Sequence, residues 1–186
     1  MSRILESIVC GLVLTASSMV VAQGSGFDCS KAKATAEKTV CSDSGLAALD
    51  RKMNELYKSA TKTPALVADQ KKWMAERNAC GSSHDCLQTS YQRRIVALGV
   101  LGGQLTTQFK AKLDCGAGKK PLSAAFYNNT DPASAVLNYG GEQAVLLTAM
   151  SGSGSRYTAP GVEYWEHQGE AAVTWHGTKM TCKVVR

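Results

Sequence analysis

The sequence predicts an α+β protein of two small domains, a disulfide-stapled helical domain followed by an antiparallel β domain. Its 186 residues are enough for one domain or two small ones. In the first half, apolar residues recur at the spacing of amphipathic helices, whereas in the second half they form short runs separated by turn residues. Of the seven cysteines, six follow the first segment, and an even number in an exported chain is typical of disulfides.

Residues 1–22 are predicted to be a cleaved signal peptide. "MSR" carries a cation, "SIVCGLVLTASSMVV" has the length of a signal-peptide apolar region, and "VVA" offers small residues for cleavage after Ala22. The apolar run is shorter than the roughly 20 residues that a membrane-spanning helix needs. A lipid anchor at Cys10 is not expected, because the bulky Val9 precedes it and the apolar run continues after it. We therefore expect a periplasmic protein with no stable membrane anchor in its mature form.

Residues 27–98 carry three apolar stripes, each of which predicts a helix. "CSDS" supplies N-cap residues before the first stripe, Thr63 and Pro64 are a cap and a first helical position for the second, and Asp85 is expected to cap the third. The stripes are interpreted as core faces. Their members are Leu46, Leu49, Met53, Leu56, Tyr57, Leu66, Val67, Trp73, Met74, Leu87, Tyr91, Ile95 and Leu98.

The composition and the spacing of apolar residues change after residue 98. "GVLGGQLTTQ", residues 99–108, is glycine-rich and uncharged and is expected to be a linker. In residues 109–186, short apolar runs are separated by Asp-Pro, Gly-Gly, Ser-Gly and His-Gly, a pattern typical of a small antiparallel barrel or sandwich. Trp165 and Trp175 lie on two of these runs and are expected in its core.

The four cysteines of the helical half allow three disulfide pairings. A Cys80–Cys86 bridge is easy across a short loop and would leave Cys29 with Cys41. A straight helix would hold Cys29 and Cys41 about 18 Å apart, whereas a disulfide needs Cα atoms within about 7 Å. Either that helix is short and broken, or the pairing crosses between helices. Zinc ligation by Cys80, His84 and Cys86 is not expected, because their spacing matches no usual zinc pattern.

The formal net charge of +6 is unevenly distributed. Residues 27–98 carry an excess of lysine and arginine, but between residues 121 and 178 the only lysine or arginine is Arg156. The carboxylates of that stretch are Asp131, Glu142, Glu163, Glu166 and Glu170. A basic chain can indicate a nucleic-acid partner, but export and the lack of a basic cluster with interleaved aromatic residues argue against one.

The stretch "SGSGSRY", which ends at Tyr157, matches no catalytic motif. A serine stands where G-x-S-x-G requires its first glycine, and a tyrosine stands where G-x-G-x-x-G requires its last. Ser153 and His167 could form a dyad, but no third group to orient it is evident. We therefore expect no enzyme, no cofactor and no metal. A Ser/Gly run on its own is usually a flexible linker.

The helical half, residues 27–98, resembles the LprI-type N-terminal domain. The matching stretches are "FDCSKAKATAEKTVCSDSGLAALDRKMNELY" and "QKKWMAERNACGSSHDCLQTSYQRRIVAL". Their Cys, Leu-Asp, Gln-x-x-Trp, Arg-Asn-x-Cys and Cys-Leu placements are specific when taken together. The resemblance implies lysozyme resistance, although no residue of this half explains it. A second inhibitor, a spacer and an adaptor for another partner are the alternatives.

The β-rich half, residues 109–186, resembles the MliC/PliC family of inhibitors of c-type lysozyme. The shared segments are "DCG", "LSAAFYNN", "SGSGSRY", "YWEHQGEAAVTW" and "TCKV". The resemblance implies an antiparallel eight-stranded β-barrel with a bridge between Cys115, near its start, and Cys182, near its end. It also implies that this domain plugs the cleft of a c-type lysozyme, so that the enzyme cannot cut peptidoglycan.

The same resemblance implies a binding site. In this family the serine of the SGSG loop, here residues 151–154, enters the lysozyme cleft, and a lysine of a W-x-K-G stretch meets the catalytic carboxylates. By position the serine is Ser153 and the lysine is replaced by His167, because this chain reads "WEHQG" with its glycine one residue later. The predicted cleft-binding residues are Ser153, His167, Gly152, Gly154, Arg156 and Tyr157.

The histidine changes how such a site would depend on pH. An imidazole ordinarily titrates near pH 6.5, so much of it is neutral at pH 7. We therefore hypothesise that inhibition through His167 strengthens as the pH falls towards about 6. Arg156 is a second candidate cation. The alternative function is a non-enzymatic adaptor or binding protein of the cell envelope whose lysozyme-inhibiting loop is degenerate.

Overall fold

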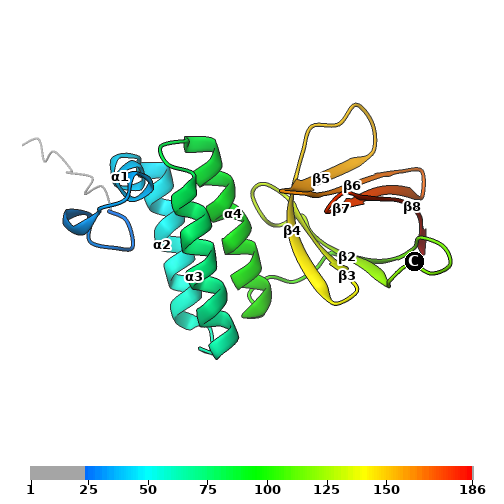
Figure 1. Cartoon of the computed structure of the whole chain (residues 1–186), viewed down its shortest axis with the longest axis horizontal. Helices are drawn as coiled ribbons and strands as arrows, with labels where there is room; N and C mark the ends of the chain where they lie inside the picture. The colour runs from blue at the N-terminus through cyan, green and yellow to red at the C-terminus, as the bar shows by residue number, and fades with distance from the viewer. Residues whose placement is uncertain (1–23, 186) are drawn as a thin grey trace, which may run out of the picture.

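A computed structural model describes residues 24–185 and shows four α-helices followed by a closed eight-stranded antiparallel barrel (Figure 1). The predicted fold class is therefore confirmed. Within the described residues, no helix is both long enough and apolar enough to span a membrane. The expected signal peptide and Cys10 lie outside this range.

The helical domain begins with a short 3-10 helix, and two of its α-helices start at residues whose side chains cap them. Asp43 accepts a hydrogen bond from the Leu46 amide (2.8 Å), and Thr63 accepts one from the Leu66 amide (3.1 Å). Ser83 occupies the N-cap position of the last helix without a side-chain capping bond, so the expectation that Asp85 caps it is wrong; Asp85 lies in the first turn, where a carboxylate interacts favourably with the helix dipole. The elements are η1 (Cys29–Lys31), α1 (Thr35–Ser42), α2 (Ser44–Ser59), α3 (Pro64–Ala79) and α4 (His84–Leu101).

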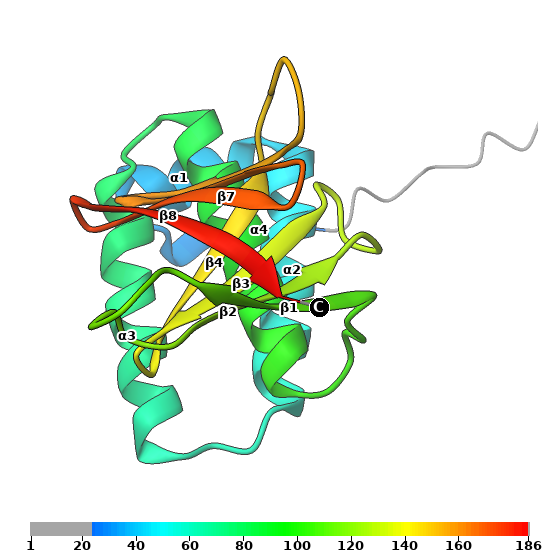
Figure 2. The same ribbon diagram turned by 90° about the vertical axis from the view of Figure 1, so that its right-hand side faces the viewer.

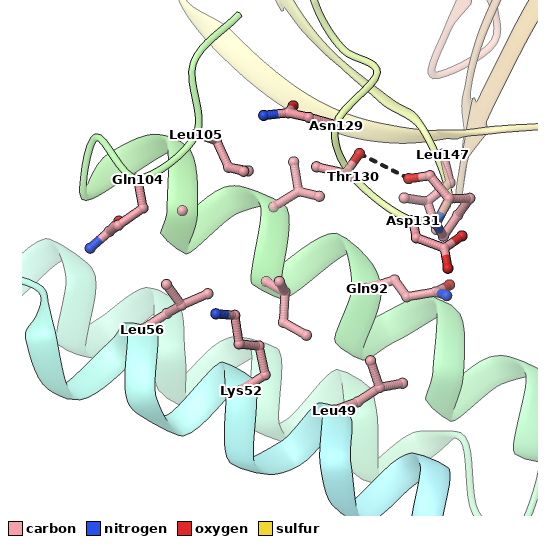
Figure 3. A pocket seen from close by; sticks show the side chains of 14 residues that line it. Leu49, Lys52, Leu56, Gln92, Gln104, Leu105, Asn129, Thr130, Asp131 and Leu147 are labelled. Carbon is pink, nitrogen blue, oxygen red and sulfur yellow. Dashed lines mark hydrogen bonds between the residues drawn. The ribbon is translucent and has the colours of Figure 1, made fainter.

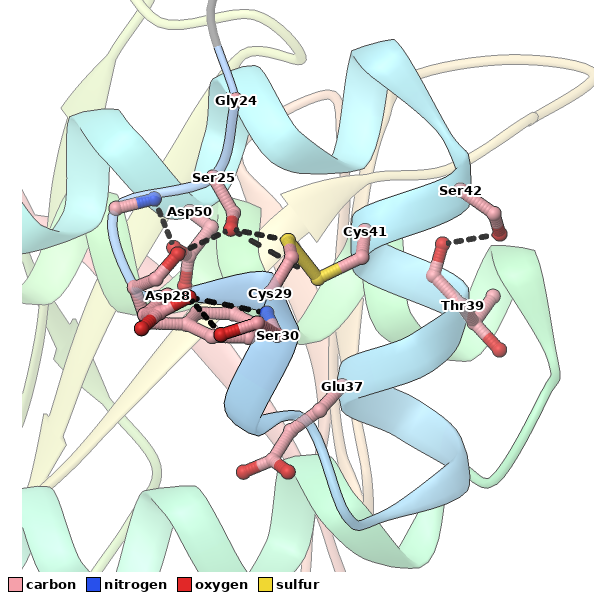
Figure 4. Close-up of a disulfide and its surroundings, with 12 residues drawn as sticks. Gly24, Ser25, Asp28, Cys29, Ser30, Glu37, Thr39, Cys41, Ser42 and Asp50 are labelled. Carbon is pink, nitrogen blue, oxygen red and sulfur yellow. Dashed lines mark hydrogen bonds between the residues drawn. A yellow bond between two sulfur atoms is a disulfide. The ribbon is translucent and has the colours of Figure 1, made fainter.

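Two disulfides staple this domain. Cys29 pairs with Cys41, with Cα atoms 5.8 Å apart, and Cys80 pairs with Cys86, with Cα atoms 5.5 Å apart. The first pairing is possible because η1 and α1 are separate helices joined by a bend, and not one straight helix (Figure 4). Of the two alternatives left open by the sequence, the short and broken helix is therefore the correct one. The second bridge uses Cys80 and Cys86, the two cysteines considered above as zinc ligands.

The buried carboxylate of Asp50 links several elements of the helical domain through hydrogen bonds. Asp50 on α2 is 1% exposed and accepts hydrogen bonds from the Tyr91 hydroxyl (2.9 Å) and the Gly26 amide (2.7 Å). The Tyr91 hydroxyl in turn accepts a bond from Arg77 on α3 (2.8 Å). Burial, together with the nearby Asp50 charge, raises the pKa of Tyr91. This network connects α2, α3, α4 and the chain that precedes η1.

The barrel is a simple meander in which each strand pairs antiparallel with the next and β8 pairs with β1. The Cys115–Cys182 bridge joins the end of β1 to β8, as the resemblance implied. Alternate side chains point inward and form one apolar core. The strands are β1 (Phe109–Asp114), β2 (Leu122–Tyr127), β3 (Ser134–Tyr139), β4 (Glu142–Thr148), β5 (Ser155–Ala159), β6 (Val162–His167), β7 (Glu170–Trp175) and β8 (Thr178–Val185).

The two domains share a small apolar interface. Val96 on α4 packs with Tyr127 and Val136 on the outer face of β2 and β3, and all three are buried. A cavity of about 400 Å³ lies beside this cluster, lined by α2, α4 and the loop between β2 and β3 (Figure 3). Helix α4 runs on to Leu101, inside the segment expected as a linker, so residues 102–108 are the irregular connection.

We expect Asp50→Asn to lower the free energy of unfolding by about 3 kcal/mol, because it removes the charge that compensates the buried Arg77 guanidinium. Urea unfolding followed by far-ultraviolet circular dichroism measures this. Glu55→Gln, an exposed acid on the same helix, is the matched control and should stay within about 0.5 kcal/mol of wild type. Equal effects of the two substitutions would show that the network does not stabilise the domain.

Candidate functional site

The SGSG loop lies in the connection between β4 and β5, which projects from one end of the barrel (Figures 1 and 2). The Ala149 amide donates to the Arg156 carbonyl (2.8 Å) and closes the base of this connection. Ser153 is exposed. The loop is therefore presented to solvent on a closed hairpin and does not separate two domains, as a linker would.

The loop is held by side chains at two levels. Inside it, the Ser151 hydroxyl donates to the Ser153 carbonyl. From β6, the Trp165 indole N–H donates to that same carbonyl at 2.9 Å. Trp165 is 42% exposed, so the expectation that it packs in the core is wrong, because its ring lies on the outer face beside the loop; Trp175 is buried as expected. These bonds give a Ser/Gly run a defined shape.

Gly154 brings the loop into direct contact with β6. Its φ of +69° is in the left-handed region that favours glycine, and a Cβ at this position would overlap the carbonyl oxygen of Glu166. The same Cβ position lies 3.2 Å from the Cβ of His167. Gly152 has open space where its Cβ would lie. The structure thus places the SGSG loop beside His167, two segments that the sequence could only relate through a resemblance.

His167 ends β6 and is followed by a two-residue turn. Gln168 and Gly169 have φ values of 54° and 86°, the pattern of a type I′ hairpin turn. Gln168 occupies the position where the family pattern has its glycine, and it adopts the left-handed conformation that glycine takes without strain. The Gly169 amide donates to the Glu166 carboxylate (2.9 Å), which supports the turn. The late glycine therefore leaves the hairpin intact, and His167 stays exposed.

Arg156 and Tyr157 follow the loop on β5, and both side chains already have partners on the barrel. The Arg156 guanidinium forms an ion pair with Glu163 (2.6 Å) and lies 5.8 Å from the centre of the Trp165 ring. Tyr157 is 7% exposed and packs in the barrel beside Tyr164, and burial raises its pKa. Arg156 is thus a charge already paired on the barrel surface, and Tyr157 is a core residue at the base of the loop.

Two features of the site were not identified from the sequence. One is the bond from Trp165 to the loop, and the other is the exposure of Met150, which directly precedes the loop and is 94% exposed. Alternation along β6 would have revealed the first, since Val162 and Tyr164 point inward and Trp165 must then point outward. No groups of three or more His, Cys, Asp or Glu residues suited to a metal ion occur among residues 24–185.

We expect Gly154→Ala to lower the free energy of unfolding by about 2 kcal/mol, because the methyl group must displace β6 or force the loop out of its left-handed conformation. Gly152→Ala, two residues away in open space, should change it by less than about 0.5 kcal/mol. Thermal or urea unfolding of the full chain distinguishes the two. A loop that tolerated both substitutions equally would not be anchored at Gly154.

Comparisons with known proteins match both domains of the chain. The family described as "Lysozyme inhibitor LprI" matches residues 29–98, and the family described as "Membrane-bound lysozyme-inhibitor of c-type lysozyme" matches residues 114–181. Lipoprotein LprI of Mycobacterium bovis and that of two Mycobacterium tuberculosis strains are each 37% identical to the chain over 166 residues. The aligned region covers 86% of this chain and 84% of each relative.

These relatives are named lipoproteins, which does not support the expectation that the mature chain lacks a membrane anchor. Both family descriptions are of inhibitors and not of enzymes, in agreement with the lack of a catalytic motif in the sequence. Because both domains match in order and the relatives align over most of their length, the chain belongs to the LprI family of lysozyme inhibitors, with an MliC-type barrel as its second domain.

Proposed function

We propose that this protein inhibits c-type lysozyme by inserting the SGSG loop into the active-site cleft of the enzyme. The observation that supports this most directly is the contact of Gly154 with the end of β6, which places Ser153 and His167 on one exposed edge of the barrel. A loop that is already ordered loses little conformational entropy when it enters a cleft. The result would be protection of peptidoglycan.

The chemistry of the enzyme fits these two side chains. Glycosidases of this kind use two carboxyl groups that flank the scissile bond. The Ser153 hydroxyl can both donate and accept a hydrogen bond, as a sugar hydroxyl does. A protonated His167 can form a charge-assisted hydrogen bond to the ionised carboxylate. Binding alone then occupies the acid and the nucleophile, and the inhibitor needs no chemistry of its own.

His167 is the cation that we assign to the enzyme's carboxylates. Arg156 is a less suitable candidate, because its charge is paired with Glu163 and its guanidinium lies over the Trp165 ring. The exposed acidic residues of this half would favour approach to a basic partner more than the final affinity.

The proposed site of action is the periplasm. Three disulfides, Cys29–Cys41, Cys80–Cys86 and Cys115–Cys182, are typical of an oxidising compartment. The predicted signal peptide would deliver the chain there. A lipid anchor at Cys10, as the name of the relatives invites, would also keep the SGSG loop outside the cytoplasm, so the inhibitory proposal does not depend on which form is correct.

The double substitution Ser153→Ala with His167→Ala should weaken inhibition by about thirtyfold, the loss of roughly 2 kcal/mol expected for an interface hot spot. The measurement is the lysis of a peptidoglycan suspension by a c-type lysozyme in the presence of the full chain. The matched control is Ser123→Ala with His176→Ala, an exposed serine and histidine elsewhere on the barrel. Wild-type protein that inhibits no better than the double variant would remove the loop from the mechanism.

A second candidate function is that of an envelope adaptor whose inhibitory loop is degenerate. The observation in its favour is His167 at the family's lysine position. The positive excess of the helical domain would favour anionic surfaces of the envelope. A folded wild-type chain that binds peptidoglycan but does not slow lysozyme would support this function over the first.

His167→Lys should strengthen binding at pH 7.5 and flatten its dependence on pH. Histidine side chains in general gain positive charge between pH 8 and 5, so a histidine at this contact makes binding to a carboxylate depend on pH. Lysine is already charged at both values. Glu170, opposite His167 on β7, is kept in both proteins, so it does not bias the comparison. Titration calorimetry at both pH values measures this, and identical profiles for the two proteins would exclude His167 from the contact.

A further inference from the structure

Two exposed apolar side chains flank the SGSG loop. Met150 directly precedes the loop and is 94% exposed, and Trp165 is 42% exposed and bonded to the Ser153 carbonyl. Single exposed apolar residues are normal on protein surfaces, but these two both adjoin the loop, Met150 along the chain and Trp165 through its hydrogen bond to the Ser153 carbonyl. Methionine and tryptophan are also enriched in the cores of protein interfaces. The loop therefore carries an apolar flank beside its polar tip.

The polar residues assigned to the enzyme leave part of a lysozyme cleft without a partner. The general acid of a c-type lysozyme lies in a hydrophobic pocket against a tryptophan, which is what keeps it protonated. Ser153 and His167 offer that apolar wall nothing to pack on. Methionine is flexible and polarisable, fits irregular apolar surfaces and makes favourable contacts with aromatic rings through its sulfur.

We propose that Met150, which directly precedes the loop held by Trp165, is an apolar anchor that packs against the apolar wall of the lysozyme cleft while Ser153 and His167 engage its carboxyl groups. This inference rests on the proposed function. Trp165 is itself fixed, since its N–H donates to the loop and Arg156 lies over its ring. The same Arg156 guanidinium donates to the Met150 carbonyl (3.5 Å), which ties the backbone at Met150 to this surface. The carboxylates nearby, Glu163 and Glu166, disfavour an anionic membrane as the occupant of this surface.

The anchor would also make inhibition sensitive to oxidation. A peroxide transfers one oxygen atom to the Met150 thioether, giving the sulfoxide, while the peroxide is reduced to water. The sulfoxide is polar and packs poorly on an apolar wall. Because Met150 is almost fully exposed, it is open to this reaction in the folded protein.

The test compares three variants of the full chain in a lysis assay with a c-type lysozyme. Met150→Gln keeps the length of the side chain but makes it polar, and should weaken inhibition at least tenfold. Met150→Leu keeps the apolar character and should stay within about threefold of wild type. Met74→Gln, on α3 and 39% exposed, is the matched control and should have no effect. Hydrogen peroxide treatment should weaken the wild type as Met150→Gln does, and should leave Met150→Leu active.

Each other outcome overturns the proposal. Met150→Gln that inhibits like wild type would show that no apolar anchor exists. If Ser153→Ala with His167→Ala still weakened inhibition about thirtyfold, the proposed function would survive alone. Met150→Leu as weak as Met150→Gln, or an equal loss in Met74→Gln, would show that the effect is not apolar packing at Met150. A wild-type chain without any inhibition would overturn the proposed function and the anchor together.

Discussion

The site depends on the contact between Gly154 and the carbonyl of Glu166. No side chain fits between the two backbones, so the return of the loop towards β5 is fixed against β6. That contact sets the position of Ser153 relative to His167, and the bond from Trp165 fixes the same loop from the side. The barrel makes this possible, because β6 is paired on both edges, with β5 and β7, and is therefore costly to displace. A Ser/Gly run, flexible by composition, is thereby given one conformation by its surroundings.

The helical domain packs against the barrel through buried side chains and is not joined to it by residues 102–108 alone. Val96, Tyr127 and Val136 would be exposed if the domains were separated, and α4 continues into the region expected as a linker. Experiments on either half alone would therefore create a new apolar surface, which is why the full chain is the correct material for tests of inhibition. Figure 1 shows the loop projecting free of the helices, so the helical domain leaves the proposed contact open.

Local rules were enough to predict α2, α3 and α4, a cap for α2 within "CSDS", the cap at Thr63 and the strand-rich second half, because these follow from periodicity and capping. The start of α4 lies two residues before the expected cap, because the helix begins after Ser83 and takes Asp85 into its first turn. Trp165 was expected in the core because it is hydrophobic, but the alternation of side chains along β6 directs it outward. The contact at Gly154 could not be predicted from residue types, since it joins two strands through the fold.

This chain has Gln168 where the family pattern has glycine and His167 where it has lysine. These differences keep the shape of the turn and change the charge of the site. Gln168 takes the left-handed conformation of the missing glycine, and Gly169 follows with the same sign of φ, so the turn and the exposure of His167 are kept. What changes is the charge, which in a histidine depends on pH and in a lysine does not. Arg156 is a poor substitute for the lysine, because it would have to break its ion pair with Glu163 and leave the Trp165 ring. The Met150 side chain carries no charge, so in a site of this design its contribution to affinity would not change with pH.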